Sequence, residues 1–84
     1  MALVAGERHY DVAVYPNPVN TILTVSATES MNAIRIVDLT GKVVAEYNGN
    51  GITQEINVED LKAGIYTIQI ETAAGNSSKQ FVKK

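Results

Sequence analysis

The sequence predicts an all-β fold, a small immunoglobulin-like antiparallel β-sandwich of about seven strands with Greek-key-like connections. Three observations lead to this fold class. Val, Ile and Thr are abundant and alternate with polar residues in short runs. No window of about a dozen residues keeps the apolar spacing of an amphipathic helix. Residues typical of turns separate the alternating runs at the spacing expected for a sandwich.

The composition sets the size of the domain and excludes several classes of function. The chain has 84 residues and no cysteine, so we expect one domain with an aliphatic core and no disulfide. A net charge of -2 with interspersed signs provides no basic face for nucleic acid and no polybasic patch for a membrane surface. No apolar run approaches the roughly 20 residues that span a bilayer.

Residues 1–10 carry little pattern, and we expect them to be a linker or an added leader before a folded domain of residues 11–84. The apolar start of this segment is too short for a secretory signal peptide and lacks a basic beginning. The chain is therefore either cytoplasmic or a fragment of a longer protein whose export signal lies upstream. We favour the fragment.

The alternating runs predict strands at residues 11–15, 22–27, 33–39, 42–47, 53–58, 64–72 and 77–83. In each of the well-patterned runs, one set of alternate side chains is apolar and should face the core. These side chains are Leu23, Val25, Ile34, Ile36, Ile56, Val58, Tyr66, Ile68, Ile70 and Phe81. A shift by one residue would expose each set, so the runs fix their own register.

The first strand should end at Tyr15-Pro16-Asn17-Pro18. Both prolines lack an amide donor, so no central ladder can run through them. Each proline also keeps the residue before it out of the helical region. Tyr15 and Asn17 should therefore be extended and form a stiff corner.

Glycines mark the later turns. Residues 38–42 are typical of a type I turn that begins at Asp38 and is closed by a left-handed Gly41. Residues 48–51 read Asn-Gly-Asn-Gly and supply several positions that tolerate positive φ. Residues 73–76, which include Gly75, are typical of another hairpin turn.

The spacing Leu61-x-x-Gly64-x-Tyr66 is typical of the tyrosine corner of Greek-key sandwiches. In that motif a tyrosine hydroxyl bonds to the backbone a few residues upstream. The alternative is a core tyrosine whose hydroxyl meets water. The two interpretations differ in whether the hydroxyl has a backbone partner.

Residues that would carry catalysis or bind a metal are sparse, so we expect neither an enzyme nor a metal or cofactor site. His9 is the only histidine and lies in the segment with little pattern, where a solvated side chain is the favoured interpretation. No cluster of Cys or His suits zinc. Glu59-Asp60 is the only adjacent acidic pair, and we interpret it as a cap of the turn before Leu61.

Four segments occur in order along the chain: Tyr15-Pro16-Asn17-Pro18 with an alternating strand after it, residues 34–42 with an Asp-Gly hairpin, Leu61 to Tyr66, and the basic end from Lys79 to Lys84. Together they resemble the type A C-terminal sorting domain of the type IX (Por) secretion system, from about residue 11 to the end. Thr21 departs slightly from this pattern, because the family often has a more polar or acidic residue there.

The resemblance implies a function that composition does not show. Such domains lie at the C-terminus of secreted enzymes and adhesins, so a cargo domain would precede this one. Translocon and shuttle proteins of the type IX system would carry the cargo through the outer membrane. A sortase-like cysteine protease would then remove the domain at the cell surface, within residues 5–10. The cargo would be secreted or placed at the cell surface, via the periplasm and outer membrane.

The last predicted strand, residues 77–83, should lie at a sheet edge, where unpaired amides can add to a partner's sheet. Exposed lysines beside that edge would favour encounter with a partner of opposite charge. The residues expected to form the recognised surface are Gly64, Tyr66, Lys79, Phe81, Val82, Lys83 and Lys84. The alternative is that Tyr66 and Phe81 only hold the core and that the lysines only protect the edge from pairing. We favour this alternative for the two aromatics, and recognition for the terminal lysines.

Two other functions stay open on the sequence. A carbohydrate-binding or spacer sandwich of a secreted hydrolase would use Tyr10, Tyr15 and Tyr47 as an aromatic platform, although packing is the favoured interpretation of each. An adhesive sandwich would exchange edge strands between copies, with a homodimer as its simplest form. An enzyme is the least favoured interpretation.

Overall fold

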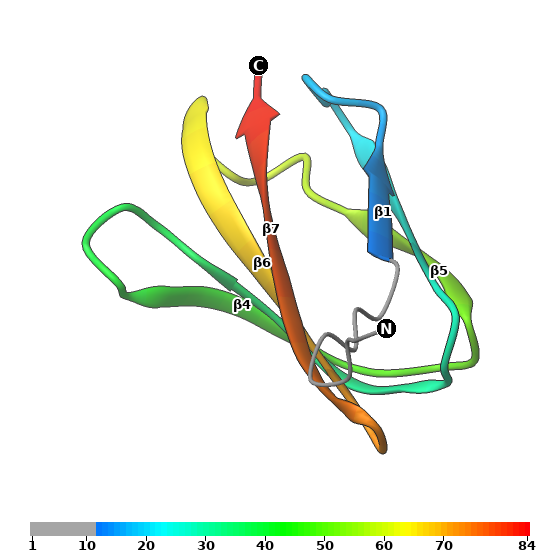
Figure 1. The fold of residues 1–84 in the computed structure, drawn as a ribbon. Coiled ribbons are helices and arrows are strands. Elements are labelled where there is room, and N and C mark those ends of the chain that lie inside the picture. The colour runs from blue at the N-terminus through cyan, green and yellow to red at the C-terminus, as the bar shows by residue number, and fades with distance from the viewer. Residues whose placement is uncertain (1–11) are drawn as a thin grey trace, which may run out of the picture.

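The computed structural model describes residues 12–84, which form two antiparallel sheets packed face to face (Figure 1). The first sheet has the order β1-β2-β5, with strands Val12–Tyr15, Ile22–Ala27 and Thr53–Asn57. The second has the order β4-β3-β6-β7, with strands Val43–Asn48, Met31–Val37, Gly64–Thr72 and Gly75–Lys83. The predicted all-β sandwich is confirmed.

The chain changes sheet after β2, after β4 and after β5, so both sheets are built from segments that are distant in sequence. β6 pairs with β3 rather than with β5, which precedes it. β1 lies beside β7 at one side of the sandwich, where the two sheets approach each other (Figure 1). This arrangement brings the first and last described parts of the chain together. Residues 12–84 contain no helix that is long and apolar enough to cross a membrane.

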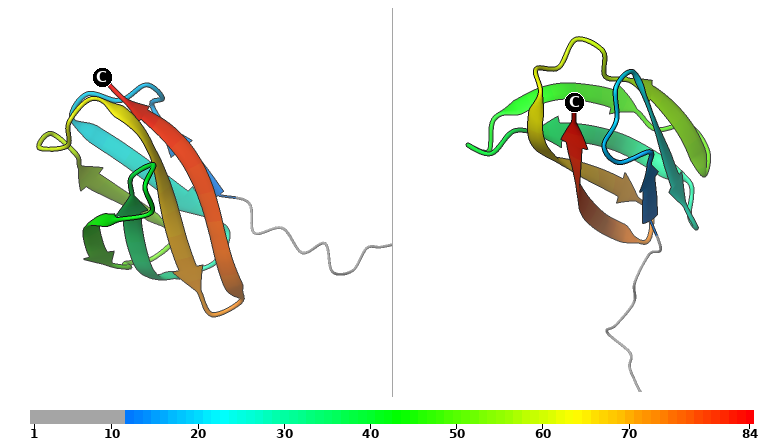
Figure 2. Two further views of the ribbon diagram at one scale, coloured as in Figure 1. Left: turned by 90° about the vertical axis from the view of Figure 1, so that its left-hand side faces the viewer. Right: turned by 90° about the horizontal axis from the view of Figure 1, so that it is seen from above.

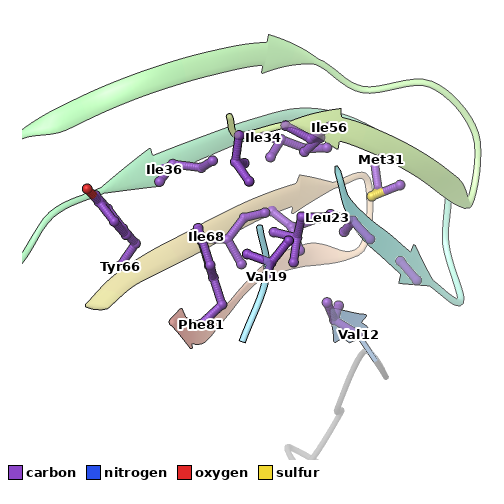
Figure 3. Close-up of a cluster of buried hydrophobic side chains, with 14 residues drawn as sticks. Val12, Val19, Leu23, Met31, Ile34, Ile36, Ile56, Tyr66, Ile68 and Phe81 are labelled. Carbon is purple, nitrogen blue, oxygen red and sulfur yellow. The ribbon is translucent and has the colours of Figure 1, made fainter. Parts of the chain in front are cut away.

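The core lies between the sheets and matches the alternation of the sequence (Figure 3). All of the side chains predicted to face inward are buried, and most of them expose 2% or less of their surface. The buried apolar residues that the pattern did not predict are Val12, Val19, Ala27, Met31 and Val37. Val19 is fully buried although it belongs to no strand, and Figure 3 shows it between Leu23 and Ile68.

Some strand ends differ from the prediction because local turns compete with pairing. β3 ends at Val37 rather than at Leu39, since the Asp38 carbonyl accepts a hydrogen bond from Gly41 N at 3.0 Å and Leu39 is 72% exposed in that turn. β7 begins at Gly75 rather than at residue 77, because Thr72 pairs directly with Gly75 across a two-residue turn. Residue 11, predicted as the start of the first strand, lies outside the described residues.

Position 49 requires glycine because the backbone of another strand lies too close for a side chain, and not because its φ is positive. It lies where the chain leaves β4, and its amide donates to the Asn32 carbonyl at 2.8 Å. A Cβ atom on Gly49 would collide with the carbonyl of Met31. Gly51 has φ of +74°, so the prediction of a left-handed residue in this connection is confirmed there.

Candidate recognition surface at the C-terminal strand

Residues 17–19 lie along the end of β7 and form what we call the strap. The Val19 amide donates to the Val82 carbonyl at 2.8 Å, and the Lys84 amide donates to the Val19 carbonyl at 2.9 Å. These bonds give Val19 a parallel bridge to Lys83. Figure 2 shows the C-terminal end of β7 beside the loop that follows β1. The proline-rich motif near the start of the chain is therefore in contact with its basic end.

Asn17 adds a side-chain bond to the strap. Its Oδ1 accepts a hydrogen bond from the Val82 amide at 2.9 Å, across 65 positions of sequence. The neighbouring Pro16 and Pro18 have no amide to compete for this contact, and the peptide bonds before both prolines are cis. Tyr15, at the end of β1, is half-exposed beside them.

The last strand lies at the edge of its sheet, as expected, and the strap pairs with one part of that edge. Val82 directs both its N–H and its C=O away from β6 and towards the strap, so the edge is closed over residues 82–84. In an antiparallel pair such outward groups recur at every second residue. Ser78 and Gln80 therefore also direct their backbone groups outward, and no described residue hydrogen-bonds to them there. The open part of the edge is the polar first half of β7.

Tyr66 and Phe81 belong to the core. They are paired in register across β6 and β7, and their rings stack with centroids 5.6 Å apart and an interplanar angle of 22°. Phe81 is fully buried and Tyr66 is 8% exposed. The Tyr66 hydroxyl donates to the Lys62 carbonyl at 2.6 Å, so of the two interpretations left open by the sequence the tyrosine corner is the one observed. The expectation that the Phe81 side chain itself meets a partner conflicts with this burial, because the ring has no exposed surface in the folded domain.

The three lysines of the last strand lie in different environments. Lys79 and Lys84 are exposed, and no described carboxylate pairs with either of them. Lys83 is only 8% exposed, because its side chain lies on the same face of β7 as Phe81, and its Nζ donates to the Lys84 carbonyl at 3.2 Å. Two of the three ammonium groups therefore lie at the surface, whereas the stem of Lys83 contributes to packing.

An exposed apolar pair lies on the outer face of the four-stranded sheet, which is the face of β7 opposite to Lys79 and Phe81. Ile65 is 44% exposed and Val82 is 39% exposed, and the two are paired in register. Gly64 precedes Ile65, faces Lys83 across the strands and has φ of +157°. Ile65 was missed by sequence reasoning, although its position between Gly64 and the inward Tyr66 would have assigned it to this face.

Asp38 and Gly41 are structural, as predicted. The Asp38 Oδ1 accepts bonds from the Thr40 hydroxyl at 2.6 Å, the Thr40 amide at 2.9 Å and the Lys42 amide at 3.1 Å. The Thr40 hydroxyl, followed by the Lys42 amide, holds the pKa of Asp38 below its ordinary value. Gly41 has φ of +89°, which confirms the left-handed closure of this turn.

The turn before Leu61 is capped differently from the prediction. Asn57 Oδ1 accepts the Glu59 amide at 2.8 Å, so the cap is Asn57 rather than the acidic pair that follows it. The Leu61 amide donates to the Val58 carbonyl at 3.0 Å, and its side chain packs against the core. Gly75 has φ of +143° at the end of the last hairpin, where its carbonyl accepts a bond from the Thr72 hydroxyl at 3.0 Å.

The aromatic platform of a carbohydrate-binding module is not assembled in the described part of the chain. Tyr15 lies on β1 and Tyr47 lies on β4, and these strands belong to different sheets at opposite sides of the sandwich (Figure 1). Tyr47 is half-buried, and this burial raises its pKa. Tyr10 and His9 lie outside the described residues. Within residues 12–84 no three His, Asp or Glu side chains gather as a metal site.

A family model described as the secretion system C-terminal sorting domain matches residues 13–84, nearly all of the folded region. The chain belongs to this family. The sorting domain is also 35% identical over 75 residues to beta-agarase D of Zobellia galactanivorans, an alignment that covers 89% of this chain and 15% of that protein. The resemblance to type IX sorting domains is thus confirmed. The sorting domain is a C-terminal signal that directs export to the cell surface or the medium.

Proposed function

We propose that the sorting domain is the address of a larger cargo protein and is read by the translocon and shuttle proteins of the type IX system. The observation that carries this proposal is the family match over residues 13–84. The chain spans only 15% of the relative that it matches, so the cargo domain would lie on the N-terminal side of β1. A sortase-like cysteine protease would then cut within residues 5–10, before the first strand.

The domain itself acts as a label and not as a catalyst in this proposal. Its family consists of sorting signals. The carboxylate of Asp38 accepts the hydrogen bonds of a turn, and the hydroxyl of Tyr66 donates the hydrogen bond of a tyrosine corner, so both groups have structural roles. No cofactor is required for such a role.

The surface that a receptor would read differs from the one expected from sequence. It comprises exposed groups at the start of β6 and in the second half of β7, while Tyr66 and Phe81 support them from the core side. On the outer face of the sheet this surface has the apolar Ile65–Val82 pair and Lys84, and Lys79 lies on the other face of β7. An apolar centre with charges at its rim combines affinity with electrostatic steering.

The experiment is to place this domain at the C-terminus of a passenger protein in a bacterium with a type IX system. We expect the passenger outside the cell and without the domain. The controls are the passenger alone and a host that lacks a working translocon, in which the fusion should stay inside. Retention of the fusion in the intact host, with the domain shown to be folded, would refute the proposal.

A homodimer through the open edge of β7 is a separate outcome that the same preparation tests. The outward backbone groups of Ser78 and Gln80 would pair between copies. A concentration-dependent change in sedimentation would support this association, and a constant monomer mass would exclude it.

A further inference from the structure

We infer that Asn17 is a positioning residue of the sorting signal, and that it holds the end of β7 in the arrangement that the export machinery reads. The inference rests on the proposed function. Asn17 lies in the strap, and its Oδ1 is the acceptor for the Val82 amide at 2.9 Å. No backbone carbonyl of the described residues takes this amide, which faces away from β6.

The surface that Asn17 positions is exposed and lies at the end of a strand. On its inner side this part of β7 pairs with the start of β6, through Gly64 with Lys83 and Ile65 with Val82. The last residues of a strand open most readily, since few contacts hold them. The strap supplies a second row of hydrogen bonds on the outer side.

Asn17 differs from Val19 in what its loss would do. Val19 is fully buried and packs in the core, so its removal would damage the whole sandwich. Asn17 is exposed and contributes an acceptor from its side chain. Removal of that acceptor leaves both backbone bonds of Val19 and the complete core in place. Loss of the Asn17 acceptor can therefore make residues 82–84 less ordered while the domain still folds.

The test compares Asn17→Ala with Asn17→Asp, which keeps an oxygen acceptor at the same place. Thr40→Ala is the control for a comparable loss of a turn hydrogen bond, because Thr40 bonds to Asp38 in the hairpin between β3 and β4, away from the tail. Amide exchange at Val82 and Lys84, thermal unfolding and export of a fused passenger are measured for each variant.

We expect Asn17→Ala to exchange the Val82 amide about fivefold to tenfold faster, since one net hydrogen bond is lost, and to export the passenger several-fold less well. Asn17→Asp should restore both properties, and Thr40→Ala should lower the unfolding temperature yet export normally. Wild-type export from Asn17→Ala, or an unchanged Val82 exchange rate, would overturn the inference while the proposed function stands. If the unaltered domain exports nothing, the proposed function is wrong and the inference falls with it.

Discussion

Tyr66 stacks on Phe81 across the last two strands, and the same tyrosine donates its hydroxyl to the Lys62 carbonyl at 2.6 Å. One residue thus fixes both the loop before β6 and the ring that anchors β7. This relationship ties the stability of the C-terminal strand to two interactions that can be removed separately.

Phe81→Ala should lower the free energy of unfolding by about 3–5 kcal/mol, because it removes a fully buried ring and leaves a cavity. That loss is a large part of the free energy of unfolding of a small domain, which is about 5–15 kcal/mol. Denaturant titration followed by circular dichroism measures the loss. Val82→Ala is the matched control on the same strand, since Val82 is 39% exposed, and a loss as large as that of Phe81→Ala would contradict the assigned faces.

Tyr66→Phe should cost about 0.5–1.5 kcal/mol, because it removes the donor to Lys62 and keeps the stacked ring. The midpoint of urea unfolding reports the change. Tyr47→Phe is the comparison, since the Tyr47 hydroxyl is 3.5 Å from the Asn57 carbonyl and forms a weaker bond. Equal losses for the two variants would argue against a tyrosine corner that contributes to stability.

Gly49→Ala should be more damaging than Gly41→Ala. At Gly41 a Cβ atom meets no neighbour, so the cost is that of a left-handed alanine, about 1–2 kcal/mol. At Gly49 the Cβ atom collides with the Met31 carbonyl, and the connection from β4 to β5 must move. Thermal unfolding ranks the variants, and the reverse order would show that this connection is loosely packed.

The Asp38 turn should make stability depend on pH in the acid range. The pKa of Asp38 is lowered by folding, so its carboxylate stabilises the domain above the unfolded value, which is near 3.8, and this contribution is lost as pH falls through the lower folded value. Asp38→Asn removes the titrating group. The difference in unfolding free energy between the two proteins should be constant near neutral pH and shrink below about pH 4. A difference that does not change with pH would contradict the assignment.

Lys84→Ser and Lys79→Ser should each reduce export of a fused passenger, with little change in unfolding temperature, because both side chains are exposed and neither pairs with a carboxylate of residues 12–84. Lys62→Ser is the control, since Lys62 is also exposed but lies in the loop before β6. If the two strand variants export the passenger as well as this control does, the two charges are not recognised and serve only to protect the sheet edge from pairing.

The core and most turns could be predicted from sequence because each depends on neighbours close along the chain. Alternation assigned Ile34, Ile36 and Ile68 to the interior, since one face of each strand is buried. The Asp38 turn was predictable from local chemistry.

The strap was not predictable in this way, because Asn17 and Val82 meet only when two sheets have assembled. Val19 lies in no alternating run, so nothing local marks it as fully buried. The requirement for glycine at position 49 likewise comes from the carbonyl of a different strand and not from its own φ. Only the resemblance to a family singled out the two segments that the fold joins.

The parallel bridge between Val19 and Lys83 also has a bearing on biosynthesis. A ribosome makes residue 19 long before residue 83, so Val19 can form this bridge only after a further 64 residues have been made. A chain whose translation stops early lacks Phe81 and the residues that Val19 bonds, and cannot complete the sandwich. The C-terminal part of the sorting signal can therefore reach its folded arrangement only in chains that have been translated to residue 83.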